Sequence, residues 1–126
     1  MKRVITTKSA PAPVGPYSQA VEADGLIFCS GQIAIDPATN EVFTGDVKEQ
    51  TKRVMGNIRA VLGAADLGFE HVVKSTIFLT NMADFAQVNE IYAGYFKDRF
   101  PARSTVAVAA LPKGVTVEIE VIAKRA

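Results

Sequence analysis

The chain has 126 residues, a length that suits one domain with one hydrophobic core, so we treat residues 1–126 as a single domain. Its 14 Lys and Arg residues nearly balance its 13 Asp and Glu residues, and the net charge of +1 lacks the basic excess that is usual in nucleic-acid-binding proteins. The single cysteine excludes an internal disulfide, and we find neither a signal peptide nor an apolar run of membrane-spanning length. We therefore expect a cytoplasmic protein.

The first third of the chain predicts a loop followed by a β-hairpin. Residues 10–16 contain three prolines and one glycine, which favours an ordered loop over a helix or strand. Residues 20–22 and 26–30 are typical of two strands that turn at Asp24-Gly25. Gly31 follows at the end of the second strand.

Two amphipathic helices are predicted in the middle of the chain. Apolar residues recur at helical spacing from Val47 to Ala65, and Asp46 with Glu49 three residues later resembles a capping box at the start of this helix. A second apolar stripe predicts a helix over about residues 82–99, which Pro101 prevents from continuing.

The remaining segments predict strands. Residues 72–79 are rich in β-branched side chains, and residues 104–111 and 115–124 form two closing strands. The order β-β-α-β-α-β-β indicates the α+β class, with a mixed sheet of about six strands and both helices on one of its faces. Small residues such as Ala107 and Ala109 lie on the closing strands, so we expect the uncovered face to pack against other subunits.

Residue counts exclude several kinds of active site. His71 is the only histidine, so a Ser-His-Asp triad and a histidine-rich metal site are excluded, and we expect His71 to be a solvated loop residue. Cys29 is more typical of a small core residue than of a nucleophile. No phosphate-binding or dinucleotide-binding glycine motif is present. We therefore expect no metal and no cofactor.

Arg103 and two glutamates are the charged candidates for a site. Arg103 opens a strand that soon becomes apolar, and its guanidinium can bind a carboxylate through two parallel hydrogen bonds; an exposed arginine at a strand start is an equal alternative. In the last strand Glu118 and Glu120 share the face opposite Val117 and Ile119. Either carboxylate can orient a water, although a solvated acidic face is the simpler interpretation.

Four segments, taken together, resemble the RidA (YjgF) family of imine deaminases. They are Gly-Pro-Tyr-Ser-Gln-Ala at 15–20, Ser-Gly-Gln-Ile at 30–33, Pro-Ala-Arg-Ser at 101–104, and Leu-Pro-Lys at 111–113 with Val-Glu-Ile-Glu at 117–120. The resemblance covers nearly the whole chain. It implies a fold like that of the small trimeric chorismate mutases and a homotrimer with sites between subunits. It also implies hydrolysis of 2-iminobutanoate and 2-iminopropanoate to 2-oxo acids and ammonia.

The resemblance also implies roles for particular residues. Arg103 matches the carboxylate-binding arginine, Glu118 matches the glutamate that places the attacking water, and Tyr17, Ser30, Gly31 and Asn89 match other pocket residues. It does not place Glu120 in the pocket. Deaminating members often have cysteine where this chain has Thr105, but the family role there rests on the backbone carbonyl, which threonine retains.

Two other functions stay open at this point. A non-catalytic module that binds small 2-oxo acids would use the same arginine. A ribonuclease or translation inhibitor is an activity attributed to some relatives, and the balanced charge argues against it. The preferred imine and the pathway that it serves do not follow from the sequence.

Overall fold

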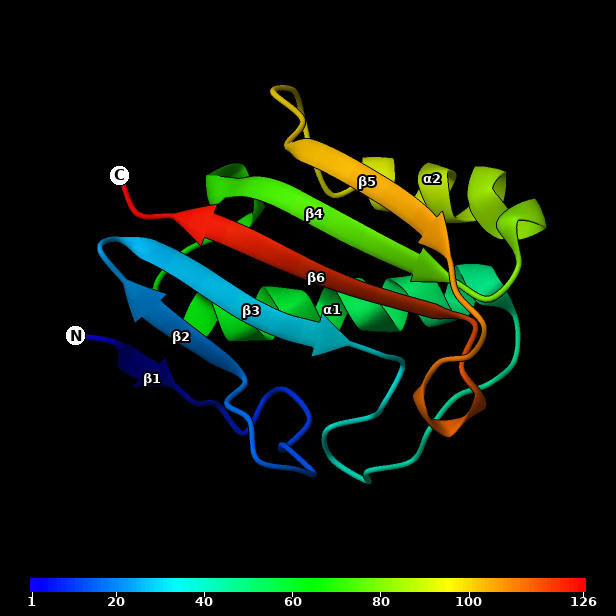
Figure 1. Cartoon of the computed structure of the whole chain (residues 1–126), viewed down its shortest axis with the longest axis horizontal. Helices are drawn as coiled ribbons and strands as arrows, with labels where there is room; N and C mark the ends of the chain where they lie inside the picture. The colour runs from blue at the N-terminus through cyan, green and yellow to red at the C-terminus, as the bar shows by residue number, and fades with distance from the viewer.

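The computed structural model describes residues 1–126 and contains one six-stranded sheet with two helices on one of its faces (Figure 1). The strands are β1 (Arg3–Ile5), β2 (Ala20–Ala23), β3 (Leu26–Gln32), β4 (Val72–Leu79), β5 (Ala102–Ala107) and β6 (Val117–Lys124); the helices are α1 (Val47–Ala64) and α2 (Phe85–Ala93). The strand order is β1-β2-β3-β6-β4-β5, and only β4 and β5 run parallel. The α+β class and the mixed six-stranded sheet are thus confirmed.

Burial of one face of α1 against the sheet forms most of the core. Val54, Met55, Ile58 and Leu62 are fully buried, as the helical spacing predicts. The Asp46 carboxylate accepts a hydrogen bond from the backbone N–H of the third helical residue at 3.0 Å. Neither helix combines the length and apolar composition that crossing a lipid bilayer requires.

Only half of the expected capping box is present. The Glu49 carboxylate pairs with Arg53 at 3.2 Å, one turn further along α1, instead of returning to the backbone of Asp46. The hairpin turn, by contrast, is as predicted. Asp24 and Gly25 have φ angles of 53° and 78°, the left-handed pair that a type I′ turn requires between β2 and β3.

Several elements differ from the prediction, three of them most clearly. β1 is a sixth strand that the pattern of elements did not contain; three residues are too few to show an alternation. Helix α2 ends at Ala93, not near Arg99. After Ala93 the backbone N–H groups bond to carbonyls three residues earlier, as in a tight turn, and Arg99 has a left-handed φ of 49°. β5 ends at Ala107 and does not continue to residue 111 as predicted.

The sheet face opposite the helices is open in a single chain. Phe28 of β3 and Val106 of β5 are 41% and 42% exposed there, and Phe78 of β4 is half-buried between them in the sheet. The two edge strands of the sheet are β1 and β5. Apolar side chains on an uncovered face are typical of a surface that packs against another protein chain.

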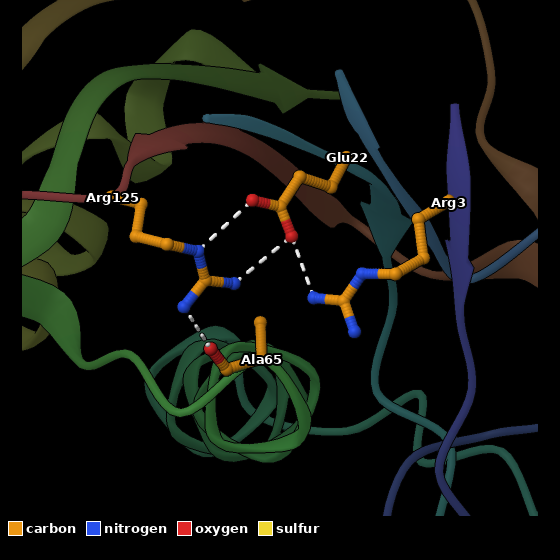
Figure 2. Close-up of polar contacts among 4 residues, drawn as sticks. All are labelled: Arg3, Glu22, Ala65 and Arg125. Atoms are coloured by element: carbon orange, nitrogen blue, oxygen red, sulfur yellow. Dashed lines mark hydrogen bonds and ion pairs between the residues drawn. The ribbon is translucent and has the colours of Figure 1, made fainter. Parts of the chain in front are cut away.

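A cluster of charged residues joins the two ends of the chain, as Figure 2 shows. Arg125 donates two hydrogen bonds of 2.9 Å to the two carboxylate oxygens of Glu22 and a third, also of 2.9 Å, to the carbonyl of Ala65 at the end of α1. Arg3 donates to the same carboxylate at 2.6 Å. These hydrogen bonds and ion pairs lower the pKa of Glu22 to about 2. We call this set the terminal clamp.

Candidate active site

Four of the predicted pocket residues line one cavity of about 470 Å³. They are Tyr17, Ser30, Gly31 and Glu118, and they come from the proline-rich loop, the end of β3 and the start of β6. This end of the sheet has its own small apolar cluster of Ile33, Ile35 and Val115, against which Val42 and Leu111 of the adjoining loops pack. We call this space the Glu118 cavity.

The side chain of Glu118 lies directly against the backbone of Gly31. A Cβ atom at position 31 would collide with Oε2 of Glu118 and would lie 3.2 Å from its Cγ. Glycine is therefore required for the carboxylate to approach β3 so closely. Burial, followed by the nearby charge of Glu120, raises the pKa of Glu118, and no cationic side chain pairs with it. A partly buried carboxylate without a cation is suited to accept a proton.

Ser30 and Tyr17 line the same cavity as Glu118. The Ser30 hydroxyl donates to the carbonyl of Ser18 at 2.6 Å, and its backbone N–H donates to the carbonyl of Gln19 at 2.9 Å, so β3 is tied to the loop. The hydroxyl of Tyr17 accepts a hydrogen bond of 3.4 Å from the N–H of Val14, and 51% of this residue is exposed. Tyr17 thus presents an aromatic ring at the mouth of the cavity.

Arg103 and Asn89 lie together in a second cavity, also of about 470 Å³. The Arg103 guanidinium donates one hydrogen bond of 2.5 Å to the side-chain carbonyl of Asn89 on α2. Its carbon lies 5.2 Å from the ring centre of Tyr92 and 5.5 Å from that of Phe85. The rings and the amide orient the guanidinium, and the rest of its hydrogen-bond donors have no partner within the chain.

The structure does not bring Arg103 and Glu118 together within one chain. In the sheet, Arg103 is in register with Ser75 and Val121, which face the helices, whereas Glu118 is in register with Phe78 on the open face. The two residues lie two strands apart and three positions out of register, so their Cα atoms are separated by roughly 14 Å. The predicted site is therefore divided into two halves.

Thr105 belongs to the half that contains Arg103. It lies two positions further along β5 and faces the helices in register with Ile77 of β4. Its hydroxyl is buried and makes no hydrogen bond within the chain. A role of its backbone carbonyl, which the resemblance implies, stays a prediction; the unpartnered hydroxyl is a second feature of this position.

Two further charged residues line the Glu118 cavity, although the sequence did not place them in the pocket. Glu120 lines the same cavity as Glu118, although the resemblance does not place it there. The alternation of β6 already put both glutamates on one face, and this was the available signal. Lys113 also lines the cavity, with a left-handed φ of 58° before Gly114; it belongs to the Leu-Pro-Lys segment of the resemblance, but no role was predicted for it.

His71 and Cys29 take no part in either half of the site. His71 Nδ1 accepts a hydrogen bond of 3.0 Å from the backbone N–H of Gly68, which is a local contact at the start of β4. Burial raises the pKa of the Cys29 thiol to about 12, so the reactive thiolate is not formed near neutral pH. No group of three His, Cys, Asp or Glu side chains is arranged to hold a metal ion.

Comparison with known proteins identifies the class of fold and site. The sequence model of the family described as Endoribonuclease L-PSP matches residues 7–125. The 2-iminobutanoate/2-iminopropanoate deaminase of Homo sapiens is 49% identical, with 98% of this chain and 90% of the human protein covered.

Solved structures agree with this class. A Rid family protein of Yersinia pestis, YyfA, has a TM-score of 0.96 at 54% identity, covering 98% of this chain and 99% of that one. Escherichia coli TdcF, solved with bound serine, has a TM-score of 0.94 at 41% identity, with 98% and 99% covered. The fold and these similarities thus define a small α+β protein of the RidA type. The chain belongs to the Rid family, whose sequence model is described as Endoribonuclease L-PSP.

Proposed function

We propose that this protein is a hydrolytic deaminase that converts small 2-imino acids, such as 2-iminobutanoate and 2-iminopropanoate, to 2-oxo acids and ammonia. The single observation that carries the proposal is the pair of unsatisfied groups: a guanidinium with free donors at Arg103 and a carboxylate without a cation at Glu118. A protonated 2-imino acid carries the complementary pair, a carboxylate next to a cationic carbon–nitrogen bond. The human relative is named for this activity, and TdcF binds serine, which is also a small molecule with a carboxylate.

The two halves of the site meet between subunits of a homotrimer in this proposal. Arg103 lies on the edge strand β5, and the neighbouring open face carries exposed apolar side chains, so both are available to a second copy of the chain. When a patch on one copy contacts a different patch on the next, the assembly closes into a ring if successive rotations return to the first copy. Three copies would then give three sites, each with Arg103 of one chain and Glu118 of its neighbour.

The reaction needs little from the protein beyond positioning and one proton transfer. Arg103, held by Asn89, binds the substrate carboxylate in two parallel hydrogen bonds. Glu118 accepts a proton from water as the water oxygen bonds to the imine carbon and the carbon–nitrogen double bond becomes a single bond. Glu118 then gives this proton to the nitrogen, the carbon–nitrogen bond breaks, and Glu118 accepts the remaining hydroxyl proton as the carbonyl forms. The departing ammonia takes up that last proton, so the products are the 2-oxo acid and ammonium. Water supplies the oxygen of the product, and no electron transfer is involved. Thr105 and Tyr17 complete the pocket walls in this scheme.

A coupled assay tests the activity. A dehydratase generates the imine, semicarbazide traps it, and added protein competes with the trap by hydrolysing the imine to 2-oxobutanoate. We expect less trapped product in proportion to added protein. If trapping is unchanged at any protein concentration while 2-oxobutanoate still binds, the protein is a binding module. If RNA is cleaved instead, the protein is a ribonuclease.

Mixing two inactive variants tests the divided site. Light scattering should first show a particle of about three chain masses, and a persistent monomer would end this model. Arg103→Ala chains supply an intact Glu118, and Glu118→Gln chains supply an intact Arg103. After unfolding and joint refolding, random assembly restores roughly a quarter of the interface sites. A site within one chain would regain no activity.

A further inference from the structure

Three buried carboxamide side chains support the Glu118 cavity: Gln19 lies in its wall, and Gln50 and Asn57 lie behind its walls on α1. Gln19, Gln50 and Asn57 are 3%, 0% and 4% exposed, and each makes at least two hydrogen bonds to backbone groups. A buried carboxamide is costly unless its donors and acceptor are satisfied, so such a side chain is retained where the backbone near it has no other partner.

Gln19 holds the proline-rich loop that ends in Tyr17. Its side-chain oxygen accepts a hydrogen bond of 2.7 Å from the N–H of Thr7. Its side-chain nitrogen lies 3.0 Å from the carbonyl of Thr7, 3.2 Å from that of Ala10 and 2.9 Å from that of Pro11. Prolines cannot donate backbone hydrogen bonds, so this loop has few bonds of its own, and Gln19 replaces them.

Asn57 and Gln50, which both lie on α1, hold two other segments of the cavity wall by hydrogen bonds. The Asn57 nitrogen donates to the carbonyls of Ile33 and Ile35 at 3.1 and 2.9 Å. Both of these residues line the Glu118 cavity just after β3. Asn57 therefore supports the second wall from the helix.

Gln50 supports the start of β6. Its side-chain nitrogen donates to the carbonyl of Gly45 at 2.9 Å, and its oxygen accepts a hydrogen bond of 3.0 Å from the N–H of Thr116. Thr116 comes two residues before Glu118 in the chain. Through this bond the rigid helix sets where the strand that carries the glutamate begins.

We propose that Gln19, Gln50 and Asn57 are positioning residues that hold the three walls of the Glu118 cavity for imine hydrolysis, an inference that rests on the proposed function. None of the three side chains needs to touch the substrate. Each fixes one wall segment: the Tyr17 loop, the segment after β3, and the beginning of β6. Small displacements at such walls cost activity out of proportion to their cost in stability, because the reacting groups lose alignment.

Amide hydrogen exchange in the wall segments and the binding of 2-oxobutanoate test the proposal together. The variants are Gln19→Met, Gln50→Met and Asn57→Leu, and the matched control is Thr51→Val. Thr51 is also fully buried in α1, but its hydroxyl donates only to Val47 of the same helix at 2.8 Å. We expect each variant to speed amide hydrogen exchange in its own wall segment and to weaken 2-oxobutanoate binding about tenfold or more, with β4 still protected. The control should do neither.

Gln50→Glu provides a second test if an apolar variant does not fold. A neutral carboxyl keeps one donor and one acceptor, as the carboxamide does here, whereas a carboxylate loses the donor. Burial raises the pKa of such a carboxyl. The affinity for 2-oxobutanoate, taken as a ratio to the wild-type value at each pH, should be near one at pH 5 and fall toward pH 9. The ratio removes the titration of Glu118, and a constant ratio would overturn the role of Gln50.

Other outcomes are equally decisive. Faster exchange in a wall segment with wild-type affinity and turnover would overturn the proposal, because the position of that wall would not matter. If the wild-type protein neither hydrolyses an imine nor binds 2-oxobutanoate, the proposed function is wrong. The exchange data alone then decide whether the carboxamides hold these walls, and exchange that is unchanged or spread over the whole chain counts against them.

Discussion

The terminal clamp and the two halves of the site use the same types of charged residue in opposite ways. In the clamp, Arg125 donates three hydrogen bonds, two to Glu22 and one to Ala65. The carboxylate of Glu22 also accepts a hydrogen bond from Arg3. In the site, Arg103 has one partner in the chain, Asn89, and Glu118 has no cation at all.

The pKa values follow the same division. Hydrogen bonds to arginines lower the pKa of Glu22 to about 2, whereas burial raises the pKa of Glu118. A charge that is satisfied within the chain contributes to folding, and a charge that is left without a partner is available to a ligand. The presence or absence of partners within the chain therefore separates structural from functional charges, and substitutions at the two sets should have different effects.

Glu118→Gln should have the largest effect. The amide keeps the shape of the carboxylate but cannot accept a proton, so imine hydrolysis should fall by about 10²-fold or more. Binding of 2-oxobutanoate, which depends on Arg103 and the pocket walls, should persist. The coupled assay and calorimetric titration measure the two quantities, and wild-type turnover in this variant would show that another group activates the water.

Arg103→Lys should weaken substrate capture by roughly ten- to a hundred-fold, because an ammonium cannot form two parallel hydrogen bonds with a carboxylate. Arg125→Lys is the matched control. It should leave kcat/KM unchanged but lower the urea concentration at the unfolding midpoint, since it breaks the fork on Glu22. Reversed results for the two lysine variants would refute the division between structural and functional arginines.

Glu120→Gln should keep most of the activity and shift its pH dependence. The charge of Glu120 is the second cause, after burial, of the raised pKa of Glu118. Removing that charge should lower the pKa of Glu118, so the acidic limb of the rate profile should move to lower pH. A loss of activity as large as that of Glu118→Gln would instead assign Glu120 a direct part in the chemistry.

Glu22→Gln should have the smallest effect, and only on stability. Because the pKa of Glu22 is lowered in the folded protein to about 2, its contribution is present above its ordinary value of 4.5 and is lost as the pH falls toward 2. The difference in urea midpoint between wild type and variant should shrink from pH 7 to pH 3. Glu90→Gln, which removes an exposed pair with Lys48, should show a smaller difference at pH 7.

Local patterns predicted the elements well, and their limits have physical causes. The periodicity of α1 and the Asp24-Gly25 turn depend on neighbours in the sequence, and both were predicted correctly. β1 exists only because its three residues pair with β2, far along the chain. Helix α2 is shorter than its apolar spacing predicts: Tyr95 and Phe96 continue that spacing from irregular backbone, where their rings contact Phe69.

The residues of the site were easier to predict than their arrangement. The motifs named Arg103 and Glu118, but no pattern along one chain indicates that they face opposite sides of the sheet. That separation depends on the register of β5 against β4 and of β4 against β6. The alternation of β6 places Glu120 on the face of Glu118 but does not show that both line one cavity. The roles of the buried carboxamides depend on their contacts with segments far along the chain, which leave no periodic signal in the sequence.

The terminal clamp also determines where this chain can be cut and joined. Arg3 and Arg125 contact the same carboxylate, so the N- and C-termini lie close together at one end of the sheet, as Figure 1 also shows. A short linker can therefore connect the two ends, and a circular permutant can begin instead within the exposed turn at residues 37–40. Such a permutant retains every strand pairing and the connections on which both halves of the site depend.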